Sequence, residues 1–193
     1  MAWNSVHCGS RTRFIKAEEQ LSTKLRRASI EEVIKMVWDC YADLGIIEKN
    51  DILKKKDIYP VYQIKEELDK EEGNVKIDYN VFPVKDKRDL VWIKFTSDGY
   101  VGVVASSNDI NFQIPIDKSV YDDKNQNKWK YNSSGIIIRE LGKEWDKSFV
   151  LVFPIFRMPG SMTRHGVEKA VGNYLINNKV IVLDYYSHRI GGK

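Results

Sequence analysis

The chain has 193 residues, of which 42% are hydrophobic and 11% aromatic, so it can close the core of one domain or of two small ones. Charged residues make up 30%, as in ordinary soluble proteins, and no apolar run approaches the roughly 20 residues that span a bilayer. Two cysteines, Cys8 and Cys40, are too few for a disulfide framework or a structural zinc set. Because the first residues also lack the apolar stretch of a secretory signal, we expect a cytoplasmic protein without a membrane segment.

The net charge of +4 is unevenly distributed along the chain. Residues 1–28 and residues 157–193 each hold six basic side chains against two acidic ones, so the middle of the chain is acidic. A basic end can attract phosphate groups, which makes nucleic acid or a nucleotide a candidate partner. The alternative is a basic surface that is only solvated.

Two helices are predicted before residue 46. Apolar residues recur every three or four positions over residues 13–28, which predicts an amphipathic helix. Ser29 to Glu32 has the pattern of a capping box, so a second helix should begin there and end at Gly45. The first helix carries the residues that we expect to contact nucleic acid: Arg11, Arg13, Arg26 and Arg27.

Two shorter helices are predicted at residues 50–56 and 61–71, the latter starting after Pro60 and stopped by Gly73. Over residues 30–96 the order of helices and strand resembles a winged helix-turn-helix, in which residues 61–71 would be the recognition helix. Five acidic residues fall in or beside that helix, so only its first turn could approach a phosphate-lined groove. A plain helical part over residues 1–73 is the alternative.

After Gly73 the hydrophobic period changes to two. Alternation over residues 75–79 predicts a half-buried strand, and residues 89–95 and 100–106 predict a hairpin around the Asp98-Gly99 turn. Residues 110–116 suit an edge strand because Pro115 has no amide hydrogen to donate.

In the last third of the chain, the hydrophobic pattern predicts a helix, a strand, a helix and a strand, at residues 135–146, 149–155, 164–177 and 180–186. Both strands are apolar on both faces, which is typical of parallel strands covered by helices, so we expect them to be adjacent or one strand apart. The predicted fold class is therefore α+β: an N-terminal helical part (residues 1–73), then an antiparallel meander and a parallel β-α-β unit in a mixed sheet (residues 74–193).

The connection from Phe156 to Gly166 would leave the carboxyl end of one strand of that unit, and Asp184 to Arg189 would leave the other. Open α/β sheets bind their ligands at such an edge. We expect anion-binding groups from the glycine backbone, the hydroxyls and the arginines, namely Arg157, Gly160, Ser161, Thr163, Arg164 and Arg189. The candidates for acid–base chemistry are Asp184, His165 and His188. Each of these residues also has an ordinary structural role as its alternative: a turn, a cap or a surface ion pair.

No complete catalytic motif is present. The order of elements over residues 30–155 is similar to the restriction-endonuclease-like core, but Trp92 stands where that resemblance requires a carboxylate. Thiol chemistry is disfavoured because Cys40 lies near the apolar face of a predicted helix. The sequence identifies no metal or cofactor and does not decide whether the protein is an enzyme.

The function predicted first is binding of a phosphate-bearing ligand, most of all nucleic acid, with phosphodiester chemistry at the carboxyl edge as a further step. The alternative is a non-enzymatic module that binds a protein partner or regulates one.

Overall fold

The computed structural model describes residues 25–49, 62–64, 66–69, 74–77, 88–108, 114–115 and 145–184. Residues 13–24 of the first predicted helix, the helix predicted at 50–56, and residues 135–144 of the helix predicted at 135–146 lie outside these ranges, as do Arg11, Arg13, His188 and Arg189. Within them, two helices and two antiparallel sheets establish a mixed α+β protein. The division at residue 73 stays a prediction.

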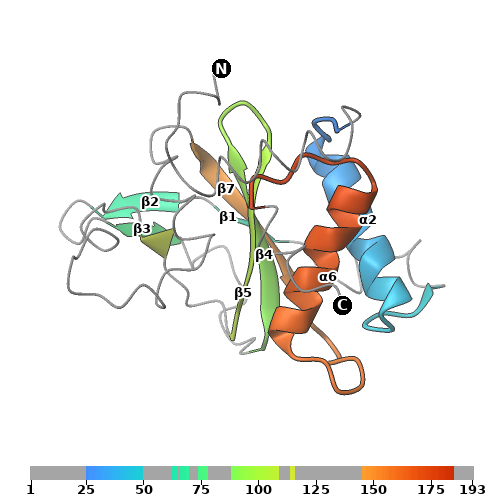
Figure 1. The fold of residues 1–193 in the computed structure, drawn as a ribbon. Coiled ribbons are helices and arrows are strands. Elements are labelled where there is room, and N and C mark those ends of the chain that lie inside the picture. Colours follow the sequence, from blue (N-terminus) through green and yellow to red (C-terminus); the bar gives the residue numbers. More distant parts are fainter. Residues whose placement is uncertain are drawn as a thin grey trace, which may run out of the picture.

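The main sheet has four strands, in the order β1 (Tyr62–Ile64), β7 (Trp145–Pro154), β4 (Leu90–Thr96) and β5 (Val101–Ser107), and each neighbouring pair is antiparallel (Figure 1). The predicted β4–β5 hairpin is confirmed. Gly99 in its turn has φ +83°, a conformation that side chains with a Cβ rarely adopt.

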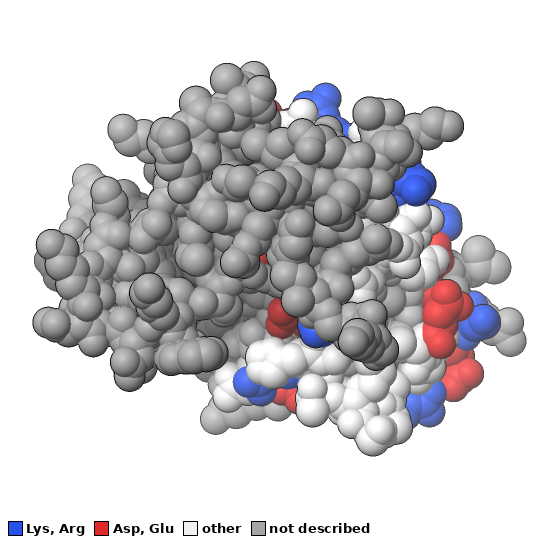
Figure 2. Space-filling model, viewed as in Figure 1, with Lys and Arg blue, Asp and Glu red and all other residues white. Residues whose placement is uncertain are grey.

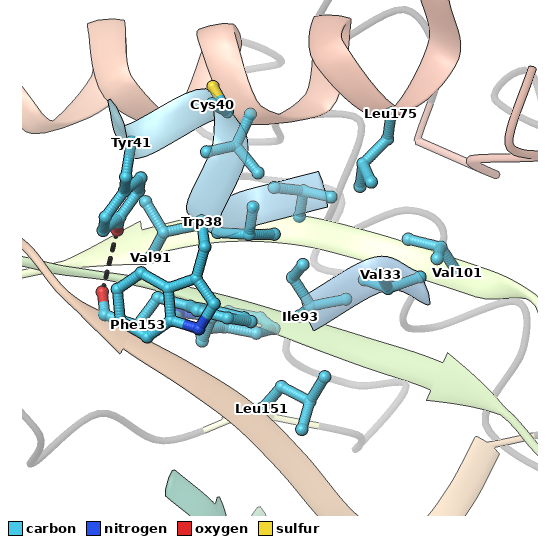
Figure 3. Close-up of a cluster of buried hydrophobic side chains, with 14 of the residues drawn as sticks. Val33, Trp38, Cys40, Tyr41, Val91, Ile93, Val101, Leu151, Phe153 and Leu175 are labelled. Atoms are coloured by element: carbon cyan, nitrogen blue, oxygen red, sulfur yellow. Dashed lines mark hydrogen bonds between the residues drawn. The ribbon is translucent and has the colours of Figure 1, made fainter. Parts of the chain in front are cut away.

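Helices α2 (Ile30–Asp43) and α6 (Arg164–Asn177) pack side by side over one face of this sheet (Figure 1). Figure 3 shows how they bury it: Trp38 and Tyr41 of α2 and Leu175 of α6 lie above the strands. The Tyr41 hydroxyl donates to the Phe153 carbonyl at 2.9 Å, which satisfies a polar group inside an otherwise apolar core.

The caps of both helices follow the sequence. The Ser29 side chain accepts from the Glu32 amide while the Glu32 carboxylate accepts from the Ser29 amide, so the capping box is present. Gly45, with φ +72°, follows the last turn of α2. Helix α6 has the predicted bounds, and Thr163 caps it by accepting from the Gly166 amide.

The helix predicted at residues 61–71 is wrong. That stretch contains β1 and β2 (Glu66–Asp69), and β2 forms a small second sheet with β3 (Asn74–Ile77) and β6 (Ile114–Pro115). The pairing of β1 with β7 and of β2 with β3 outweighs the helix propensity of this stretch, because propensity is worth only tenths of a kcal/mol per residue. The resemblance to a winged helix-turn-helix therefore fails at the segment that would be the recognition helix. The strand predicted after Gly73 and the edge position of Pro115 are confirmed.

The predicted parallel β-α-β unit is not confirmed. Both neighbours of β7 are antiparallel to it, and residues 180–184 form only isolated parallel bridges, between Val182 and Val101 and between Val180 and Arg26. Residues 180–182 thus run in the same direction as β7, but β4 and β5 lie between them. A strand that is apolar on both faces is a strand that is buried on both faces. An antiparallel strand covered on both faces has the same pattern, so the pattern does not show the direction of its neighbour.

Two smaller predictions are also corrected. Residues 25–28, the predicted end of the first helix, are extended, because the amide and carbonyl of Arg26 bond to Lys179 and Ile181. Residues 145 and 146 belong to β7 and not to a helix. Neither α2 nor α6 is long and apolar enough to cross a membrane, and they are the helices in the part of the chain described.

Candidate functional site

One edge of the main sheet gathers side chains from β5, from α6, and from the residues just before β4 and just after β7. Leu90 pairs with both Pro154 and Ser107 there, and the chain leaves β7 and turns into α6 at the same place, at the lower end of the sheet in Figure 1. The Ile155 amide donates to the Asp89 carbonyl at 2.8 Å. We call this place the α6 edge; it comprises Arg88, Asp89, Ser106, Phe156, Gly160, Arg164, His165 and Glu168.

Arg164 is the first residue of α6, and its hydrogen-bonding capacity is largely unused among the described residues. Its Nη1 lies 3.4 Å from Asp89 Oδ1, a long contact through one of the five N–H donors of the guanidinium. Its Nε is buried and has no hydrogen-bond partner in the described part of the chain. A guanidinium with spare donors at a helix start suits a bidentate oxyanion such as a phosphate.

His165, the next residue, is held through one ring nitrogen. Its Nδ1 lies 3.2 Å from Ser106 Oγ and 3.4 Å from Glu168 Oε2, while Ser106 donates to Glu168 at 2.6 Å. The Ser106 hydroxyl donates to Glu168 and not to the imidazole, and the serine and glutamate oxygens both lie beside Nδ1. The three residues therefore do not form the serine–histidine–carboxylate relay of hydrolases. They orient the imidazole, whose side chain is 68% exposed, and leave its Nε2 for another partner.

The connection before α6 is open. Gly160 has φ +53°, and a Cβ added there would meet nothing within 4 Å. The Met162 amide donates to the Pro159 carbonyl in the turn, and the Thr163 hydroxyl is occupied by the cap, while Ser161 is exposed. The amides of the first turn have no partner within the helix and carry the positive end of its dipole.

Arg157 serves a different purpose from the one predicted. Its Nε and Nη2 donate to the Gly45 carbonyl at 3.1 and 2.7 Å, and Nη2 also reaches Glu48 at 3.3 Å. The guanidinium therefore joins the turn just past the C-cap of α2 to the connection after β7.

Among the described residues, Asp184 is not brought together with His165 or with the predicted anion-binding residues of the connection before α6. Its amide donates to the Gly102 carbonyl near the start of β5, whereas Ser106 of the α6 edge lies four residues further along that strand, about 13 Å away at the usual rise per residue. Asp184 is only 1% exposed. The predicted convergence depended on parallel strands that end at one edge, and residues 180–184 instead pair with the other end of β5.

The two described arginines of the N-terminal segment have structural partners. Arg26 pairs with Glu32 through two hydrogen bonds of 3.0 and 2.8 Å, and Arg27 donates to the Asp98 carbonyl at 2.7 Å. The Arg26 guanidinium and the Ser29 amide lower the pKa of Glu32 to about 2. No contact with nucleic acid is needed to account for these positions.

Several residues of the α6 edge were missed by the sequence analysis. Glu168 follows His165 at the i,i+3 spacing of a helix, so that pair could have been predicted. Ser106, Asp89, and Arg88, whose guanidinium carbon lies 5.1 Å from the Phe156 ring centroid, reach the edge only through strand pairing, for which the local sequence has no signal.

The described residues include no candidate metal cluster, and the described part of the face in Figure 2 shows no patch of one charge. Groups of three or more histidine, cysteine, aspartate and glutamate side chains that could hold a metal do not occur among the described residues. On the described part of the face in Figure 2, basic and acidic side chains alternate. Comparison with protein-family models, with curated proteins and with solved structures found no match for this chain.

Proposed function

We propose that the α6 edge binds a phosphate-bearing ligand, nucleic acid before nucleotide. The observation that carries the proposal is the Arg164 guanidinium, which lies at the amino terminus of α6 and has, among the described residues, one long contact and unused donors. Arginine and helix-start amides together are a recurrent way of binding phosphate.

The neighbouring groups support this proposal and limit its strength. His165 adds a ring nitrogen, and the open backbone at Gly160 allows close approach. Asp89 and Glu168 are acidic, but each already accepts a bond, from Arg164 and Ser106 respectively. Because their charge opposes that of a phosphate, we expect modest affinity that falls steeply with salt.

Phosphodiester chemistry, if the protein performs it, would use His165 as the proton donor or acceptor. Glu168, and not the predicted Asp184, would orient the imidazole, because the Glu168 carboxylate lies beside Nδ1. Loss of cleavage of an oligonucleotide by His165→Gln, with binding retained, would support this extension; a parent protein that cleaves nothing would remove it.

The binding proposal is tested by fluorescence anisotropy with labelled oligonucleotides over a range of salt concentrations. Arg164→Gln should weaken binding and reduce the slope of log affinity against log salt by about 1. Lys35→Gln is the matched control, because it also removes one positive charge but lies on α2, paired with Asp39.

An unchanged slope in the Arg164 variant would remove this residue from the interface. A parent protein with no salt-dependent retention of nucleic acid would contradict the proposal and favour the module that binds a protein partner.

A further inference from the structure

The hydrogen bonds around His165 determine which of its ring nitrogens carries the proton. Ser106 has a single hydroxyl proton, which it donates to Glu168 Oε2 at 2.6 Å. Towards the imidazole, the Ser106 oxygen can therefore only accept, and the Glu168 carboxylate can only accept as well. Nδ1 lies 3.2 Å from the serine oxygen and 3.4 Å from the glutamate oxygen, so the neutral ring carries its proton on Nδ1.

The other ring nitrogen of His165 is consequently an acceptor. Nε2 of the neutral ring has a lone pair and no proton, and it has no hydrogen-bond partner among the described residues. The His165 side chain is 68% exposed, so a ligand can reach it. A ligand that pairs with this nitrogen must supply a hydrogen-bond donor.

This acceptor lies beside the proposed phosphate contact. Arg164 and His165 are consecutive residues at the start of α6. Arg164 contacts Asp89, just before β4, and His165 contacts Ser106 in β5. Strands β4 and β5 are paired neighbours, about 5 Å apart, and the two contacts lie at the same end of the pair. The α6 edge therefore offers donors for a phosphate and, close to them, an acceptor.

We infer that the ligand of the α6 edge is RNA and not DNA, with a backbone phosphate at Arg164 and the 2′-hydroxyl of the neighbouring ribose donating to His165 Nε2; this inference rests on the proposed function. The 2′-hydroxyl is a donor that RNA places next to its backbone phosphates and that DNA lacks, and proteins use it to distinguish the two. The donors of the bases lie on edges directed away from the backbone and are common to both.

The test compares the affinities of single strands of one base, namely oligouridylate, its 2′-deoxy form and its 2′-fluoro form, by fluorescence anisotropy. The 2′-fluoro strand keeps the sugar conformation of RNA but has no hydroxyl proton to donate. The parent protein should bind the ribose strand about fivefold more tightly than either of the others, as expected for one hydrogen bond. His165→Phe, which has no acceptor, should bind all of the strands equally, with its thermal melt as the check on folding. Arg164→Gln should weaken binding of every strand and keep the preference for ribose.

The outcomes separate the two proposals. Equal affinity of the parent for the ribose and deoxyribose strands, a 2′-fluoro strand that binds like the ribose strand, or an unchanged preference in a folded His165→Phe variant would overturn the inference and leave phosphate binding at Arg164 standing. A parent that binds none of the strands would overturn both proposals. If His165→Phe fails to fold, the 2′-fluoro comparison with the parent decides alone.

Discussion

Arg157 illustrates how a single residue in a basic connection serves the fold. Its guanidinium donates twice to the Gly45 carbonyl, at the end of α2, while its contact with Glu48 is an exposed ion pair, with both side chains more than half exposed. The two contacts differ in kind: the first is a pair of hydrogen bonds to a backbone carbonyl just past the C-cap of α2, whereas exposed ion pairs contribute little.

We therefore expect Arg157→Gln to lower the free energy of unfolding by about 1 kcal/mol, the usual net worth of a hydrogen bond. Glu48→Gln, which removes only the ion pair, should change it by less than about 0.5 kcal/mol. Urea denaturation of both variants measures this, and oligonucleotide binding should be unchanged. Weakened binding with unchanged stability in Arg157→Gln would return this residue to the ligand site.

For Asp184, burial determines the role that we expect. A carboxylate that is 1% exposed must be hydrogen-bonded or paired, and its backbone is fixed against Gly102. Because it lies away from the α6 edge, we expect Asp184→Asn to cost about 1–3 kcal/mol of stability and to leave ligand binding intact. Thermal melting and anisotropy on this variant check both parts. Intact stability together with lost binding would place Asp184 in the site after all.

At the scale of elements, α2 depends on its amino-terminal cap and on the arginine that joins it. The Arg26 guanidinium and the Ser29 amide stabilise the Glu32 carboxylate, which lowers its pKa from 4.5 to about 2. A folded-state pKa below the unfolded value means that the contribution to stability is present above about pH 4.5 and is lost as the pH falls towards 2.

Glu32→Gln should therefore be less stable than the parent at neutral pH, and the difference should shrink between pH 4.5 and pH 2. Chemical denaturation at several pH values measures it, with Glu31→Gln as the control, because Glu31 is in the same helix turn and is not the capping-box residue. A difference between parent and Glu32→Gln that does not change with pH would contradict this account of the cap.

At the scale of the whole molecule, the two helices and the main sheet share one core. Cys40 faces α6 in that core, and burial, with the nearby Asp43 as a smaller cause, raises the pKa of its thiol to about 12 (Figure 3). A protonated and enclosed thiol does not react with alkylating reagents, so labelling of Cys40 requires the core to open.

In a Cys8→Ser variant, Cys40 should remain unlabelled by iodoacetamide at pH 8 under native conditions and should react fully in denaturant. Mass spectrometry over time gives the rate, which should rise with urea in parallel with unfolding measured by tryptophan fluorescence. Rapid labelling without urea would show that the interface between α2 and α6 opens independently of the core.

The sequence alone determined the features that depend on neighbouring residues. The capping box of α2, the bounds of α6 and the Asp98-Gly99 hairpin were predicted because caps, helical spacing and turn residues act over a few positions. The basic connection before α6 was also recognised, with Arg164 and His165 in it.

Tertiary structure decided the rest. Residues 62–64 and 66–69 form strands because β7 and β3 offer them edges to pair with, and the order of strands places Asp184 at one end of β5 and His165 near the other. Strand pairing joins residues that are far apart in the chain. The sequence around Ser106 and Asp89 therefore does not indicate that these residues contact α6. Burial on both faces can be read from an apolar run; the direction of the neighbouring strand cannot, because parallel and antiparallel partners bury the same side chains.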